Sequence, residues 1–175
     1  ANATNRVGVF FQCLSASQHF YKNKRLDLLF CQKILPLCLT GAVIGSLISV
    51  YISETLLKQM MGFSIIMVLP LVFLSPEKWL RKESRSSTKI SFSCLCLYFF
   101  IGLYGGFLQM GSGILLVTTL VLKAHKSLIE SHAIKVFILG AFTLPAILIY
   151  AYCNLIFWKT ALILSIGSII GGYLG

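Results

Sequence analysis

The stretch of residues 101–122, IGLYGGFLQMGSGILLVTTLVL, constrains the fold more than any other part of the 175-residue chain. Its glycines are closely spaced in an otherwise apolar run; they are Gly102, Gly105, Gly106, Gly111 and Gly113. Each glycine inside a helix costs roughly 1 kcal/mol relative to alanine, so this density indicates a break in the helix. In lipid, the freed backbone groups must be satisfied by protein or by a water-filled cavity. The sequence therefore predicts a broken membrane helix beside a cavity.

The residues that follow the break, 114–122, are too few to cross a bilayer. At 1.5 Å per residue they extend about 14 Å, against roughly 30 Å of hydrocarbon. We therefore predict a half-helix whose first N–H groups, at the positive end of its dipole, face the cavity and suit an anion. A simpler interpretation stays open, in which glycines such as Gly102 and Gly106 only let two helices approach closely.

Composition places the chain among membrane proteins. Hydrophobic residues make up 57% of the chain and charged residues 11%, whereas about a quarter of a soluble domain is charged. The alternating pattern of a transmembrane barrel is missing from the sequence, so the predicted fold is an all-α, polytopic transmembrane helix bundle with broken or half helices. The net charge of +10 comes mainly from short loops beside spans, where it fits positive-inside topology and anionic lipid. We expect the protein to lie in the lipid bilayer and to bind no nucleic acid. The sequence also allows a homo-oligomer.

Apolar runs predict the membrane spans. They cover residues 28–52, 56–74, 132–153 and 158–175, and residues 1–20 form a short or incomplete span followed by a polar loop across 15–27. The loop 75–89, SPEKWLRKESRSSTK, is rich in lysine and arginine, and its charge predicts that it faces the cytoplasm.

A weak internal repeat joins the two halves. ANATNRV at 1–7 aligns with SHAIKVF at 131–137, and GAVIGSLIS at 41–49 aligns with GSIIGGYLG at 167–175. We therefore expect a first repeat over 1–75, incomplete at its N-terminus, a basic cytoplasmic loop over 76–89, and a second repeat over 90–175, incomplete at its C-terminus. Such repeats are typical of transporters, with the binding site at their interface, and either a parallel or an inverted relation is open.

The chain resembles the TauE/SafE sulfite exporter family, also described as 4-toluene sulfonate uptake permeases. The family pattern, GxxGGG followed by FLLVPLL and an A-N-A-T segment, is similar to YGGFLQMGSGILLVTTL at 104–120, ESHAIKVF at 130–137 and ANAT at 1–4. The resemblance covers nearly the whole chain. It implies movement of small sulfur-containing oxyanions and organosulfonates across the cytoplasmic membrane, and a further glycine segment upstream of Ala1. This chain departs from the pattern at Gln109, Ser112, Thr118, His132 and Ile134.

An anion in a membrane loses its hydration, so its site needs several N–H and O–H donors and a positive potential. The candidate substrate-binding residues are Gly105, Gly106, Gly111, Ser112, Gly113, Thr118, Asn2, Thr4, His132 and Lys135. Interfacial snorkelling is an equal alternative for Lys135 and for Arg6, since both lie near the ends of their spans. His132 is either a helix-start residue or a carrier of a coupled proton.

The sequence argues against an enzyme, a metal site and a cofactor. The chain has five acidic residues, none in mid-span, and its six cysteines, which we interpret as buried and inert, form no zinc-type spacing. The predicted function is a multi-pass anion permease of the cytoplasmic membrane that works by alternating access. The alternatives are a non-transporting membrane subunit or scaffold, and a permease for an unrelated small organic anion.

Overall fold

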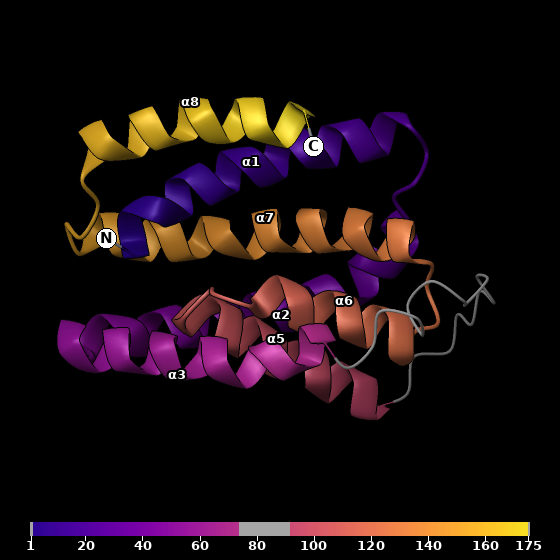
Figure 1. Ribbon diagram of the computed structural model, residues 1–175, viewed down its shortest axis with the longest axis horizontal. Helices are drawn as coiled ribbons and strands as arrows, with labels where there is room; N and C mark the ends of the chain where they lie inside the picture. Colours follow the sequence, from indigo (N-terminus) through magenta and orange to yellow (C-terminus); the bar gives the residue numbers. More distant parts are fainter. Residues whose placement is uncertain (1, 74–91, 175) are drawn as a thin grey trace.

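A computed structural model describes residues 2–73 and 92–174 of the chain, and in these residues the regular structure is helical (Figure 1). The described helices are α1 (Asn2–Lys22), α2 (Leu28–Tyr51), α3 (Glu54–Phe73), α5 (Phe92–Phe107), α6 (Ser112–Leu122), α7 (Leu128–Tyr152) and α8 (Trp158–Leu174). The predicted all-α membrane helix bundle is confirmed. The predicted cytoplasmic loop 76–89 lies outside the described residues, as does Ala1.

The helices form layers around α7. Helices α1 and α8 lie side by side on one face of α7, and α2, α5 and α6 lie on the other (Figure 1). Helices α1 and α8 run in the same direction, and α2 and α7 run opposite to them. The segments matched by the predicted repeat, α1 with α7 and α2 with α8, are therefore antiparallel. If the halves are repeats, their relation is inverted.

Glycines on both partners bring α2 and α5 into backbone contact. A Cβ built on Gly41 would lie 2.3 Å from the carbonyl oxygen of Phe99, and one on Gly106 would lie 2.1 Å from that of Ala42. Gly45 and Gly102 are equally crowded by backbone atoms of the facing helix. Both helices carry glycines at GxxxG spacing, the arrangement that lets membrane helices pack closely. The simpler interpretation of Gly102 and Gly106 as packing residues is therefore correct for this contact.

One ion pair joins the starts of α2 and α7. The ammonium of Lys126, which is 5% exposed, donates to Oδ2 of Asp27 at 2.6 Å. Asp27 also accepts from the N–H of Phe30 and so caps α2. Burial by itself would raise the pKa of Asp27, but the hydrogen bonds from Lys126 and Phe30, with the charges of Lys126 and Lys33, hold that pKa below its ordinary value. The loop that precedes α2 and the loop that precedes α7 therefore lie at the same end of the bundle.

The outer faces of the bundle are apolar. On α3, Ile66 and Met67 are exposed, and on α8, Ile163 and Ile166 are exposed. Helices α2 and α7 are long and apolar enough to cross a membrane by themselves, while α5, α6 and α8 contain shorter apolar stretches. Exposed faces of this composition match lipid rather than water.

Three sequence expectations need correction. The polar loop predicted across 15–27 is shorter, because α1 continues to Lys22. Helix α7 begins at Leu128, four residues before the predicted span, because Ser127 and Glu130 form a capping box there. The cysteines are not uniformly buried, since Cys96 and Cys153 are exposed and the other four are buried.

Candidate functional site

The predicted helix break is present in the glycine segment. Helix α5 ends at Phe107 and α6 begins at Ser112, one residue before Gly113. Within the break, Gln109 and Gly111 have φ of 65° and 77°, in the left-handed region. The chain reverses here, so that α6 runs back toward the end from which α5 came (Figure 1). The segment therefore dips into the bundle and returns.

Side chains hold the turn between the two helices. The hydroxyl of Tyr104 donates to the carbonyl of Met110 at 2.7 Å, and that of Ser112 donates to the carbonyl of Gln109 at 2.6 Å. The N–H of Leu108 bonds the carbonyl of Tyr104 at 2.8 Å and completes the last turn of α5. Backbone carbonyls freed by the break are thus hydrogen-bonded within the protein, which a lipid environment would require.

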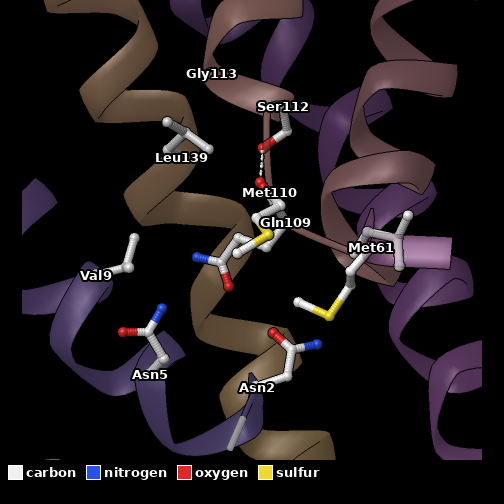
Figure 2. A pocket seen from close by; sticks show the side chains of 10 residues that line it. Asn2, Asn5, Val9, Met61, Gln109, Met110, Ser112, Gly113 and Leu139 are labelled. Atoms are coloured by element: carbon white, nitrogen blue, oxygen red, sulfur yellow. Dashed lines mark hydrogen bonds between the residues drawn. The ribbon is translucent and has the colours of Figure 1, made fainter. Parts of the chain in front are cut away.

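A cavity of about 400 Å³ opens at the break between α1, α3, α6 and α7. It is lined by Asn2, Asn5, Val9, Met61, Leu108, Gln109, Met110, Ser112, Gly113 and Leu139. Figure 2 shows the amides of Asn2, Asn5 and Gln109 directed into the same space, below the first turn of α6. The wall is otherwise apolar, so these few polar groups would orient a ligand.

The first turn of α6 offers fewer free donors than the sequence suggested. The N–H groups of Ser112 and Ile114 bond the carbonyls of Gln109 and Gly111, at 3.3 Å and 3.0 Å. Within the described residues, the N–H of Gly113 has no acceptor. Gly113 lines the cavity, so its N–H and the positive end of the α6 dipole are the backbone contribution to the site.

The model of the family described as "Sulfite exporter TauE/SafE" matches residues 1–175. The chain belongs to the sulfite exporter TauE/SafE family. It is also 25% identical over 175 residues to a "Probable membrane transporter protein" of Haemophilus influenzae, an alignment that covers 100% of this chain and 68% of that protein. No solved structure matches the chain. The predicted resemblance is confirmed, and the chain is a member of a family of membrane transporters.

Two polar residues that line the cavity of this TauE/SafE member, Asn5 and Gln109, were not among the predicted site residues. Asn5 lies one helical turn after Asn2 on α1, and that spacing on one helix face could have indicated it. Gln109 stands where the family pattern has glycine. Its Oε1 and Nε2 are buried without a partner in the structure, and it lines the cavity. A buried amide without a partner favours a ligand, since an unmade hydrogen bond is costly.

The predicted glycines Gly105 and Gly106 lie in the last turns of α5, outside the cavity wall. Their carbonyls accept hydrogen bonds from Arg6 of α1, at 3.4 Å and 2.7 Å. A Cβ on Gly105 would meet the ring of Phe142 at 2.7 Å. These glycines therefore shape the packing around the break, and a direct contact with substrate stays a prediction. Gly111 supplies the left-handed turn before α6.

Two predicted hydroxyl residues lie apart from the cavity wall. Thr4 accepts a hydrogen bond from the N–H of Phe157 at 3.2 Å and so ties α1 to the start of α8. Thr118 stands in α6 where the family pattern has proline, and its buried Oγ1 has no partner. The hydroxyl of Thr118 is therefore available, although it lies outside the residues that line the cavity at the break.

His132 and Lys135 line a different cavity of about 380 Å³ between α1, α7 and α8. Nζ of Lys135 lies 3.5 Å from Nδ1 of His132. The stem of Lys135 packs against Gly113, because a Cβ built there would lie 3.3 Å from its Cδ. Lys135 thus touches the wall of the first cavity while its ammonium lies beside His132. The sequence had grouped His132 and Lys135 with Asn2 in one site. In the structure they line a different cavity from Asn2.

Proposed function

We propose that this protein is a multi-pass permease of the cytoplasmic membrane that moves small anions by alternating access. Sulfite, thiosulfate and organosulfonates are the proposed substrates, because the family to which the chain belongs is described as sulfite exporters. No covalent chemistry is part of the proposal.

The cavity at the start of α6 is the observation that carries the proposal. It combines the N–H of Gly113, the positive end of the α6 dipole and three amides in an otherwise apolar wall. An oxyanion accepts hydrogen bonds from such donors, and the amides replace part of the hydration that it loses. Half-helix termini that point at anionic groups are a recurrent device of transporters.

Flux measurements test the proposal. Proteoliposomes that contain the full-length protein are given labelled sulfite, thiosulfate and a small sulfonate, and initial rates are measured against concentration. We expect saturable flux of at least one anion. Gly113→Leu should reduce that flux by more than tenfold, because its side chain would meet Lys135 and occupy the cavity.

Gly167→Leu is the matched control. No atom lies within 4 Å of a Cβ built on Gly167 of α8, so the same substitution should leave flux unchanged. Flux that Gly113→Leu retains would contradict the site at the break and leave transport standing. Absence of flux for all three anions in the unmodified protein would contradict the proposed substrates and favour another anion or a non-transporting subunit.

A further inference from the structure

Arg6 lies fully buried at the point where α5 ends. Its Nη2 donates to the carbonyls of Gly106 and Phe107 at 2.7 Å and 3.2 Å, and its Nη1 donates to that of Gly105 at 3.4 Å. Its Cζ lies 4.9 Å from the centre of the Tyr150 ring, and its Nε is buried without a partner. Arg6 is therefore enclosed by the bundle, and its side chain does not snorkel toward solvent.

The charge of Arg6 has no carboxylate beside it among the described residues. The three carboxylates in those residues are engaged elsewhere: Asp27 with Lys126, Glu54 with Lys58, and Glu130 with the N–H of Ser127. What surrounds the guanidinium instead is the carbonyl end of α5 and the face of an aromatic ring. Such neighbours stabilise a cation, but they leave its full charge in place.

The position of Arg6 matters because two helix ends of opposite polarity meet at the break. The carbonyl end of α5 carries about half a negative charge and the N–H end of α6 about half a positive charge. An anion in the cavity would be repelled by the first and attracted by the second. A guanidinium bonded to the carbonyls at the end of α5 more than offsets the negative pole.

We propose that Arg6 is a positioning residue of the anion site: bonded to the end of α5, it leaves the helix break with a net positive potential that draws an anion into the cavity. This inference rests on the proposed function. Arg6 adjoins Asn5 on α1, whose side chain lines the cavity. Tyr150 holds the guanidinium from the other side, and its hydroxyl is hydrogen-bonded to the hydroxyl of Ser49 on α2.

The ratio of KM values for a dianion and a monoanion tests this role. Arg6→Gln keeps an amide donor for the carbonyls and removes the charge. A unit charge on the order of 10 Å away, at an effective dielectric of about 20, changes binding by roughly tenfold for each unit of ligand charge. We therefore expect KM for thiosulfate to rise about tenfold more than KM for a small monovalent sulfonate. Arg6→Lys should keep the ratio of the unmodified protein, since the charge stays.

Arg25→Gln is the matched control, because Arg25 is exposed in the loop before α2 and its loss should leave both KM values unchanged. A purely structural role for Arg6 would lower the amount of folded protein and the maximal rate without changing the ratio, and that result would overturn the inference. If Arg6→Gln does not fold, the KM ratio is measured for Arg6→Lys alone. A ratio that differs from that of the unmodified protein would then overturn the inference as well. Absence of saturable flux in the unmodified protein would instead remove the proposed function, and this inference with it.

Discussion

At the scale of single residues, the glycines of this chain have different tasks that the structure distinguishes. Gly106 faces the backbone of Ala42 in the contact between α2 and α5, whereas Gly167 on α8 faces open space. Both follow the same GxxxG-like spacing in the sequence. The difference is the presence of a partner helix, since only a facing backbone makes the missing Cβ necessary.

Gly106→Ala should therefore destabilise the protein, while Gly167→Ala should not. A Cβ at Gly106 would lie 2.1 Å from a backbone oxygen, so α2 and α5 would have to move apart, at a cost of about 3 kcal/mol. Thermal unfolding in detergent should show a Tm lower by several degrees for Gly106→Ala. For Gly167→Ala we expect an unchanged or higher Tm, since alanine favours helix. Equal losses in the two variants would contradict this account of the contact.

At the scale of elements, the break between α5 and α6 is a turn held by specific backbone conformations and hydrogen bonds. It combines two left-handed residues, Gln109 and Gly111, with hydrogen bonds from Tyr104 and Ser112. The left-handed conformation is accessible to glycine without cost and costs roughly 1 kcal/mol or more for other residues. Gln109 thus adopts a costly backbone conformation while its amide lines the cavity.

Substitutions in the turn should separate backbone strain from side-chain function. Gly111→Val places a β-branched side chain at φ 77° and next to Val68, so we expect Tm to fall by several degrees. Gln109→Gly relieves the left-handed residue and should keep or raise Tm. The same variant removes an amide from the cavity, so we expect KM for the transported anion to rise several-fold. A lower Tm with unchanged KM in Gln109→Gly would count against both expectations.

At the scale of the whole molecule, the charges and the helix directions predict an orientation in the membrane. Loops with Lys24, Arg25, Lys123 and Lys126 lie at the end where α2 and α7 begin, whereas loops 52–53 and 153–157 lie at the other end. The positive-inside rule predicts that the first end faces the cytoplasm. Helix α7 is long and apolar enough to cross the membrane between the two ends.

Cysteine labelling at positions 125 and 155 tests this orientation. Cys96 and Cys153 are exposed, so both are first replaced by serine. In intact cells an impermeant maleimide should label Leu155→Cys from outside, and His125→Cys only after the membrane is opened. Lys24→Cys should behave as His125→Cys does, because both positions lie at the basic end. Labelling of positions 125 and 155 from the same side would rule out a crossing by α7.

Local physical chemistry made most of the fold predictable. Apolar runs separated by basic loops marked the long helices, and the glycines at 102–113 marked the break, because glycine weakens a helix wherever the helix stands. The spacing around Gly113 also predicted a short half-helix. Three residues that the sequence proposed for the site, Ser112, Gly113 and Asn2, line one cavity in the structure, and their contact with a substrate stays a prediction. These features depend on neighbours in sequence. They also depend on the cost of leaving backbone N–H and C=O groups without hydrogen bonds in lipid.

What the sequence alone determined was therefore the class, the family resemblance, the spans and the break. Only the tertiary structure decided which glycines pack and which surround the cavity, the opposite directions of α1 and α7, and the separation of His132 and Lys135 from Asn2. It also placed Arg6 on the end of α5, 99 residues away from Gly105 in sequence. The physical reason is that such contacts depend on which helix faces meet, and local propensity carries no information about the partner across the interface.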